Sequence, residues 1–315
     1  MIEILKPQTH EEWLQLRATG IGSSDVGTIL GVNPFDTPFQ LWLRKTGKAK
    51  PKEENFAMRL GHILEPAVAE LYEQESGNKV DKTTEGDWCA KNSSEEFLIA
   101  SPDRICFDKE DANKRILLEC KTTRKSVDVD NIPASWFCQV QYLMYVLELD
   151  RAAIAWLKNG QDFGYKHVLH DKKFCEFMLE KVRKFWFNNI KQDKAPEAIN
   201  GDDIALKYPM SVKGKIKQAT DELRASYDRL QTIQQQLSEL TAEKESIIDA
   251  MKIATSDAEQ LCYGDKVLGV FRGGQPTQKT FFDEKRFKAE NKDLYAHYTT
   301  VVDKLSSRSF YPKYE

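Results

Sequence analysis

Two short stretches decide the fold, Ser101-Pro102-Asp103 and Leu117-Leu118-Glu119-Cys120-Lys121. The second is predicted to be a β-strand, in which side chains at positions i and i+2 share a face. Glu119 and Lys121 therefore project together, while the intervening side chains face the opposite side, toward a core. Asp103 follows a proline corner at the start of the preceding strand. Pairing of the two strands would bring its carboxylate close to that of Glu119.

Two adjacent carboxylates favour metal chemistry. They repel each other unless a proton or a cation lies between them, and their hard oxygen ligands suit Mg²⁺ or Mn²⁺. A lysine beside that cation can orient or deprotonate an attacking water, or stabilise the charge on a phosphate, while the metal acts as a Lewis acid. The alternative is that Glu119 and Lys121 are an ordinary surface charge pair, because such pairs are common on strands.

Three further features favour the catalytic interpretation. Two leucines make the strand apolar just before Glu119, which places the charged residues at the mouth of a core. Glu65 lies within an otherwise apolar helical face and is a third candidate ligand, although a pair with Arg59 is an alternative. Gln139 is placed to point toward the same site, or alternatively caps a buried carbonyl.

The order of the predicted elements indicates an α/β fold with a mixed sheet and helices packed on it. A Gly-rich turn is expected at residues 20–25, and residues 96–123 are expected to form antiparallel strands. The predicted helices are 11–16, with Thr9 as N-cap, then 56–75, 134–149 and 172–188, and the predicted strands are 97–100, 105–107, 116–122, 152–157 and 165–169.

The C-terminal third has a different pattern. Residues 213–252 carry apolar side chains at alternating steps of four and three, which is the seam of a coiled coil interrupted by Lys244 and weakened at Ser226. We expect a long helical arm that serves as a partner or oligomer interface, or that folds back on its own domain. Beyond it, residues 260–271 and 277–282 predict a hairpin turning at Gly273-Gly274, and residues 283–297 a helix. The expected domains are 1–205, 206–255 and 256–315.

Composition limits the functional classes. A net charge of −3 argues against a protein that coats nucleic acid by charge alone. Two basic clusters are equally well explained as solvated faces: Arg44, Lys45, Lys48, Lys50 and Lys52 in one, and Lys207, Lys213, Lys215 and Lys217 in the other. The six cysteines have no zinc-finger spacing, and no signal peptide or membrane span is visible, so we expect a soluble intracellular protein.

The sequence resembles a known family. The residues that carry the resemblance are Leu16-Arg17, Gly22-Ser23-Ser24-Asp25, Gly61 with Glu65, Ser101-Pro102-Asp103, Glu119-Cys120-Lys121 and Gln139-Val140-Gln141-Tyr142. Together they resemble the lambda exonuclease and YqaJ-like viral recombinase family of PD-(D/E)xK nucleases, over about residues 10 to 190. The resemblance implies a restriction-endonuclease-like core and a 5′ to 3′ exonuclease. Such an enzyme degrades one strand of linear duplex DNA and leaves 3′ single strands for phage-type recombination.

The resemblance also implies roles for individual residues. Asp103, Glu119, Glu65 and the backbone carbonyl of Cys120 would bind metal, namely two Mg²⁺ ions for which Mn²⁺ can substitute, and Lys121 would be the catalytic lysine. Arg17, Ser24, Ser101 and Gln139 match a pocket for a 5′-phosphate. Arg104 departs from the family pattern and would contact phosphate or pair with Asp108. His62 is not expected to be a ligand.

The implied partners are double-stranded DNA ends and a single-strand annealing protein, with a homo-oligomer as a further expectation. The implied location is the cytoplasm of a bacterial or phage-infected cell. Two alternatives stay open. One is a structure-specific endonuclease with the same core, and the other is a non-catalytic DNA-binding or assembly protein that acts through its coiled coil.

Overall fold

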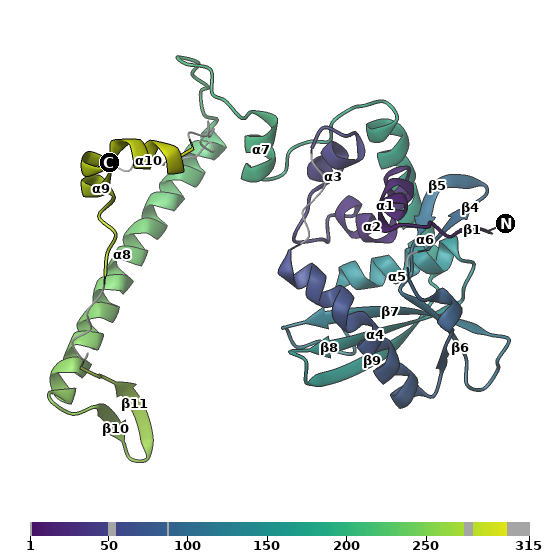
Figure 1. Cartoon of the computed structure of the whole chain (residues 1–315), viewed down its shortest axis with the longest axis horizontal. Coiled ribbons are helices and arrows are strands. Elements are labelled where there is room, and N and C mark those ends of the chain that lie inside the picture. Colours follow the sequence, from purple (N-terminus) through teal and green to yellow (C-terminus); the bar gives the residue numbers. More distant parts are fainter. Residues whose placement is uncertain (1, 50–54, 87, 274–279, 301–315) are drawn as a thin grey trace. The chain divides into compact units, whose positions relative to one another are not determined.

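The computed structural model of the chain describes residues 2–49, 55–86, 88–273 and 280–300. The chain divides into two compact units, Met1–Lys207 and Tyr208–Glu315. Figure 1 shows an α/β arrangement in the first unit and a long helix with short appended elements in the second.

The first unit is built on a five-stranded mixed sheet. Its strand order is β3-β6-β7-β8-β9, in which β7 and β8 are parallel and the other neighbours are antiparallel. The predicted mixed sheet flanked by helices is therefore confirmed. The strands are β3 (Lys79–Val80), β6 (Arg104–Phe107), β7 (Arg115–Thr123), β8 (Arg151–Lys158) and β9 (Asp162–Leu169).

Helices cover both faces of this sheet. Helix α5 (Ala134–Val146) connects the parallel strands β7 and β8 and packs on one face, against Leu117 and Ile154. Helix α4 (Phe56–Ser76) packs on the other face, against Leu118. Because both faces are covered, all residues of β8 except the two at its ends are buried, and buried and exposed residues do not alternate along it.

A second, four-stranded sheet corrects two expectations. Its order is β1-β4-β5-β2, formed by β1 (Ile2–Leu5), β4 (Cys89–Asn92), β5 (Glu95–Ala100) and β2 (Ile21–Gly22). Residues 96–123 are therefore not one antiparallel meander, because β5 and β6 belong to different sheets and only the three residues 101–103 connect them. Residues 20–25 are not a turn either, since β2 pairs in parallel with β5 and is buried.

Three of the remaining helices of the first unit begin at residues that cap them through a side chain. Thr9, Thr37 and Asp171 each accept a hydrogen bond from a backbone N–H of the following first turn. Helix α4 ends at Gly77, whose φ of 76° suits glycine. The remaining helices are α1 (His10–Ala18), α2 (Ser23–Ile29), α3 (Pro38–Lys45), α6 (Lys172–Lys184) and α7 (Gly201–Lys207), with the 3₁₀ turn η1 (Lys82–Thr84) and the π-helical segment η2 (Phe185–Ile190).

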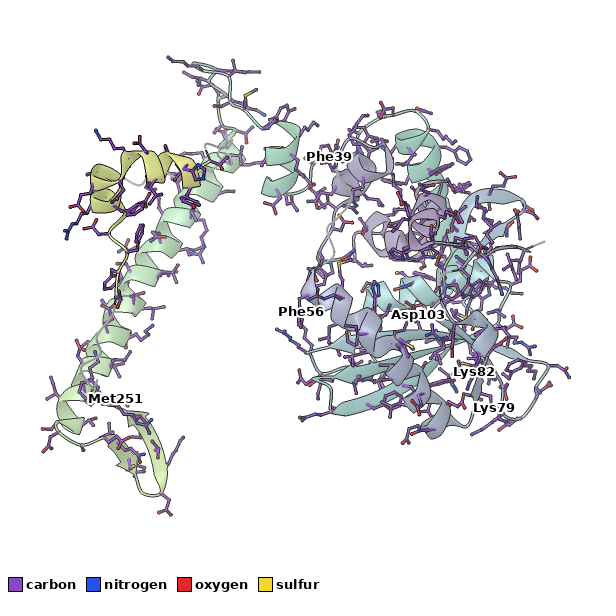
Figure 2. All side chains as sticks on the ribbon, viewed as in Figure 1. Phe39, Phe56, Lys79, Lys82, Asp103 and Met251 are labelled. Carbon is purple, nitrogen blue, oxygen red and sulfur yellow. The ribbon has the colours of Figure 1, made fainter. Side chains whose placement is uncertain are left out.

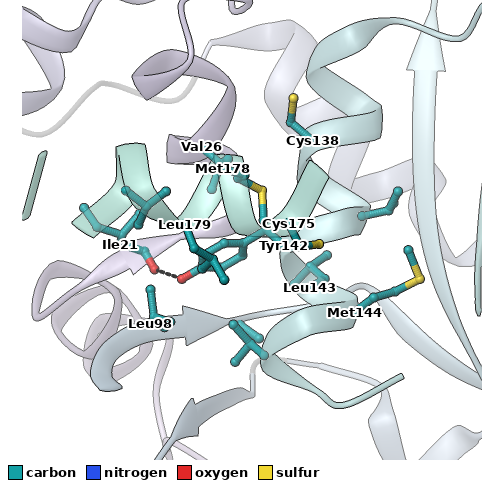
Figure 3. Packing of buried hydrophobic residues seen from close by; sticks show 14 of the residues in the cluster. Ile21, Val26, Leu98, Cys138, Tyr142, Leu143, Met144, Cys175, Met178 and Leu179 are labelled. Atoms are coloured by element: carbon teal, nitrogen blue, oxygen red, sulfur yellow. Dashed lines mark hydrogen bonds between the residues drawn. The ribbon is translucent and has the colours of Figure 1, made fainter. Parts of the chain in front are cut away.

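One buried tyrosine connects α5 to the second sheet. The Tyr142 hydroxyl donates a hydrogen bond to the Ile21 carbonyl at 2.5 Å and accepts one from the Ile99 N–H at 3.0 Å. Figure 3 shows the bond to Ile21 among packed apolar side chains that include Leu98 and Leu179. Burial raises the pKa of Tyr142 well above its usual value, so the hydroxyl remains protonated and both bonds persist.

The second unit is dominated by the 35-residue helix α8 (Asp221–Thr255), which confirms the predicted long helix. The helix begins later than residue 213, because Gly214 has a φ of 77° and Thr220 caps the helix. The hairpin β10 (Gln260–Tyr263) and β11 (Lys266–Val270) follows.

The predicted position of this hairpin turn is wrong. The chain turns at Gly264-Asp265, where Gly264 has a φ of 57°. The expected turn at Gly273-Gly274 and the expected strand 277–282 lie partly outside the described residues, because these omit 274–279. Residues 280–282 are described, and they do not form a strand. The expected C-terminal helix is two helices, α9 (Glu284–Glu290) and α10 (Lys292–Tyr298), which are separated at Asn291.

None of the helices in the described part of the chain has the length and apolar character needed to cross a membrane.

Candidate active site

The predicted alternation along β7 is observed. Leu117, Glu119 and Lys121 share the face of the sheet covered by α5, while Leu118 packs in the cluster beneath α4. Glu119 is only 2% exposed, so it is not part of a surface charge pair. The surface interpretation of the Glu119 and Lys121 pair is therefore wrong.

A triangle of side chains forms on this face. The Lys121 Nζ donates to Glu119 Oε1 at 2.6 Å and to Gln139 Oε1 at 3.0 Å. The Gln139 amide in turn donates to the same Glu119 oxygen. Gln139 comes from α5, so the helix that connects β7 to β8 also orients the lysine. The alternative that Gln139 caps a buried carbonyl is wrong.

Asp103 reaches this site from the neighbouring strand. The register pairs Arg104 with Leu118, which places Asp103 beside the Glu119 end of the ladder. Its Oδ2 accepts a hydrogen bond from the Cys120 backbone N–H at 2.7 Å. Asp103, labelled in Figure 2, lies in the connection between β5 and β6, directly before β6. The structure thus brings together Asp103, Glu119 and Lys121, as the strand pairing predicts.

Glu65 joins the cluster from α4 through an unexpected partner. The Arg104 Nη1 binds Glu65 Oε1 at 2.5 Å, and the Arg104 side chain is 8% exposed. Glu65 therefore does not pair with Arg59. Arg104 does not pair with Asp108 either, because Asp108 binds Arg151 at 2.8 Å.

Burial raises the pKa of each carboxyl group in the cluster. Desolvation, followed by repulsion from Asp103, raises the pKa of Glu119 to about 8 and also raises the pKa of Glu65. Desolvation raises the pKa of Asp103 despite the nearby Lys121. Burial alone would lower the pKa of Lys121, but Glu119 and Asp103 offset it and the pKa is raised overall. The lysine therefore remains a cation.

The donor chemistry of the cluster fits a hard divalent cation. Glu119 Oε2 is buried and has no hydrogen-bond partner among the described residues. When all three carboxyl groups are ionised, they carry more negative charge than Lys121 and Arg104 balance, and a divalent cation would compensate it. The described residues nevertheless contain no ready-made group of three His, Cys, Asp or Glu ligands around a single point. Cys120, whose carbonyl is a candidate ligand, lies between Glu119 and Lys121 on β7.

The four residues of the predicted phosphate pocket are divided among three separate sets of contacts. Arg17 Nη2 donates to Ser24 Oγ at 2.9 Å, and the Arg17 guanidinium stacks on Trp13. Gln139 belongs to the Lys121 triangle, and Ser101 contacts Cys89 Sγ at 3.1 Å. Within the ranges that the structure describes, no hydrogen bond joins Arg17 or Ser24 to Gln139 or Ser101.

Lys45 holds the segment that carries Ser24, a role that the sequence did not reveal. Its Nζ binds the carbonyls of Arg17 and Gly20, at 3.0 and 2.7 Å, and Asp25 Oδ2 at 2.8 Å. The same Asp25 oxygen accepts a hydrogen bond from the Gly22 N–H. Lys45 is therefore not part of a solvated face. Nothing in the basic cluster distinguishes Lys45 from its neighbours in the sequence. Two other members of the cluster, Lys50 and Lys52, lie outside the described residues.

Comparisons with known proteins support the resemblance. Residues 12–150 match the YqaJ-like viral recombinase domain. The protein YqaJ of Bacillus subtilis (strain 168) is 31% identical over 300 residues, which cover 91% of this chain and 90% of that protein. A protein of Acanthamoeba polyphaga mimivirus is 28% identical over 176 residues, covering 52% of this chain and 31% of that protein.

Among solved structures, an alkaline exonuclease from Laribacter hongkongensis is similar with a TM-score of 0.44 and 18% identity, covering 58% of this chain and 94% of that chain. The matched domain contains every candidate residue from Arg17 to Gln139. Since the similarity to the Bacillus protein extends over nearly the full length of both chains, this chain belongs to the YqaJ-like viral recombinase family.

Proposed function

We propose that the chain is a metal-dependent deoxyribonuclease of the lambda exonuclease type. It degrades one strand of linear double-stranded DNA from the 5′ end and leaves 3′ single strands for recombination. One observation carries this proposal: a buried carboxylate with an unpartnered oxygen, Glu119, lies between a second carboxylate and a lysine on paired strands.

Mg²⁺, in one or two ions, fits the carboxylate side of the cluster, and Mn²⁺ has the same preference for oxygen ligands. Glu119 Oε2 and Asp103 would hold it, with Glu65 and the Cys120 carbonyl as further ligands. When bound, the cation supplies Lewis acidity and aligns the scissile phosphate. The hydrogen bond from the Cys120 N–H fixes Asp103 Oδ2, and Arg104 fixes Glu65, so these carboxylates are oriented before substrate arrives.

Lys121 acts as a cation in this proposal. Its raised pKa keeps Nζ protonated, so it stabilises the negative charge that develops on the phosphate and orients the attacking water. Gln139 holds Nζ in place through its amide oxygen. Gln139 is then a positioning residue for Lys121 and also the link from α5 to the substrate side of the cluster.

Arg17 and Ser24 are the proposed recognition site for a 5′-phosphate. The Arg17 Nη2 and Ser24 Oγ atoms are 2.9 Å apart, so the guanidinium and the hydroxyl can both donate hydrogen bonds to the oxygens of one phosphate group. Lys45 keeps this segment rigid by binding the Gly20 carbonyl and Asp25. Ser101 and Gln139 complete the proposed pocket, whereas Arg104 serves the metal site through Glu65.

The proposed partners are DNA ends and a single-strand annealing protein, which would receive the 3′ strands in the cytoplasm of a bacterial or phage-infected cell. Binding of DNA should be indifferent to sequence and weaken with salt, because only phosphates would be contacted.

The test is digestion of a linear duplex in which one strand carries a 5′-phosphate and the other a 5′-hydroxyl. A covalently closed circle, EDTA, and the variants Lys121→Ala and Lys125→Ala serve as controls; Lys125 is an exposed lysine on the same segment. We expect loss of the phosphorylated strand from its 5′ end, an intact circle, no activity in EDTA or with Lys121→Ala, and full activity with Lys125→Ala. Cleavage of the circle would instead identify an endonuclease. DNA binding without cleavage would leave a binding or assembly protein.

A further inference from the structure

Helix α8 presents an apolar seam along most of its length. Together with the polar positions Ser226 and Lys244, its members alternate in steps of three and four. The apolar members are between 37% and 60% exposed, namely Leu223, Leu230, Ile233, Leu237, Leu240 and Ile247. Such a row normally packs against a second helix. Within the described part of the chain, no such helix covers it.

The open seam has a defined length. At one end α8 begins at Asp221, after the Thr220 cap. At the other end the hairpin β10–β11 covers the next seam position, where the methyl group of Met251 lies beside Gly269. Figure 2 shows Met251 at the hairpin end of α8. Among the residues that the structure describes, nothing covers the seam from Leu223 to Ile247, and its midpoint is Gln235.

We propose that α8 pairs with α8 of a second copy of this chain in an antiparallel coiled coil centred on Gln235. In this register every seam residue meets a seam residue of the partner subunit, because the open stretch is symmetric about its midpoint. The layers are Leu223 with Ile247, Leu230 with Leu240, Ile233 with Leu237, and Ser226 with Lys244, each formed twice.

The two polar seam positions support this orientation. Antiparallel pairing places Lys244 opposite the small hydroxyl side chain of the partner subunit's Ser226, in one shared polar layer near each end. Parallel pairing would place two Lys244 ammonium groups against each other inside the seam, which costs stability through desolvation and repulsion. The polar interruptions are thus tolerated in the antiparallel arrangement and unfavourable in the parallel one.

The charged residues beside the seam also favour the antiparallel orientation. Arg229 and Glu243 each directly precede a seam residue, so they lie along the same edge of α8. In an antiparallel pair this edge meets its own copy, and the register places Arg229 beside the partner subunit's Glu243 at two symmetric positions. In a parallel pair Arg229 would face Gln234, and Glu243 would face Ile248, with no opposite charges.

Charge reversal tests the orientation. We expect sedimentation equilibrium of the full chain to show a dimer. Arg229→Glu alone, or Glu243→Arg alone, should weaken dimerisation about tenfold, because each creates two like-charge contacts. The double variant restores opposite charges and should return Kd to within about twofold of the original. Arg229 and Glu243 are both exposed, and they lie about 21 Å apart along their own helix, so coupling within one chain is negligible.

Two further variants control the experiment. Glu245→Arg reverses a charge on the outer side of the helix, two residues from Glu243, and should leave Kd unchanged. Leu237→Glu buries a charge in the seam and should give a monomer that retains its nuclease-unit fold by circular dichroism. A monomeric wild-type chain, a dimer insensitive to Leu237→Glu, or a double reversal that fails to recover would each overturn the antiparallel pair. These readouts measure association only, so they are independent of the proposed nuclease activity.

Discussion

Arg104 and Glu65 form a charge pair at 2.5 Å that connects β6 to α4 at the edge of the carboxylate cluster. The arginine is nearly inaccessible, whereas the glutamate is about a quarter exposed. The pair therefore neutralises one carboxylate of the cluster and leaves Asp103 and Glu119 as the groups in need of a cation.

The Arg104 and Glu65 pair should behave as a coupled unit. We expect Arg104→Met to lower the free energy of unfolding by about 3 kcal/mol, because it leaves a largely buried carboxylate without its partner. Adding Glu65→Leu should recover part of this loss. Urea denaturation of both single variants and the double variant provides the measurement. Additive losses would show that the two residues do not stabilise each other.

Lys121→Ala should reduce turnover at least about 10²-fold while DNA affinity changes little, because the lysine stabilises charge that develops during the reaction. Single-turnover digestion and a binding titration in Ca²⁺ separate the two effects. Lys125→Ala is the matched control. Equal losses of binding and turnover would assign Lys121 to substrate binding rather than to the reaction.

The Glu119 proton should couple stability to pH. Its pKa is raised to about 8, so the folded state holds this proton more tightly than the unfolded chain does. The stabilisation is complete below the unfolded pKa and is lost as the pH rises through about 8. We expect the Tm without metal to fall as the pH rises from about 5 to about 8, and to level off above that. Mg²⁺ competes with the proton, so its stabilising effect should grow over that range.

Glu119→Gln cannot titrate, so it should reduce the pH dependence to the part that comes from Asp103 and Glu65, and it should remove the Mg²⁺ effect. Glu180→Gln, at an exposed position on α6, is the control and should leave both intact. Thermal melts at several pH values, with and without Mg²⁺, provide the measurement. A pH dependence of the Tm as large in Glu119→Gln as in the original chain would show that Glu119 is not the main titrating group.

Arg17→Ala should reduce the preference for 5′-phosphorylated over 5′-hydroxyl ends about tenfold, through loss of a charge-assisted hydrogen bond to phosphate. Initial rates on the two substrates give the ratio. Arg115→Ala, which removes an exposed arginine from β7, should not change it. A constant ratio in Arg17→Ala would remove Arg17 from end recognition.

Tyr142→Phe should lower the free energy of unfolding by about 1 to 3 kcal/mol, because the Ile99 N–H and the Ile21 carbonyl would lose their buried partner. Chemical denaturation of the full chain measures this. Tyr145→Phe, on the same helix, is a comparison that leaves both bonds in place. If Tyr142→Phe were as stable as the original chain, water would have to satisfy both groups.

Local patterns in the sequence predicted the elements that depend on neighbouring residues. The alternation along residues 117–121 correctly placed Glu119 and Lys121 on one face, and the predicted cap at Thr9 correctly located the start of a helix. Strand pairing across the Pro102 corner also predicted the approach of Asp103 to the Glu119 end of β7.

Features that depend on distant residues were not predictable. The pairing of β2 with β5 joins segments far apart in the chain, and nothing in residues 20–25 distinguishes a short buried strand from a turn. The partner of Glu65 likewise depends on how α4 crosses the sheet, which the sequence does not specify. The hairpin turn was misplaced because Gly264-Asp265 and Gly273-Gly274 are both acceptable turn sequences, and only the strand register chooses between them.

The three residues 101–103 are the direct covalent step from the four-stranded sheet to the five-stranded one, and they include two of the candidate site residues. Arg17 and Ser24, which are proposed to bind the DNA end, belong to helices beside the four-stranded sheet, while Glu119 and Lys121 belong to the five-stranded sheet. The distance from the held end to the point of cleavage is consequently set by how the two sheets pack. Substitutions in the apolar core between them, far from any DNA contact, would therefore alter where the backbone is cut.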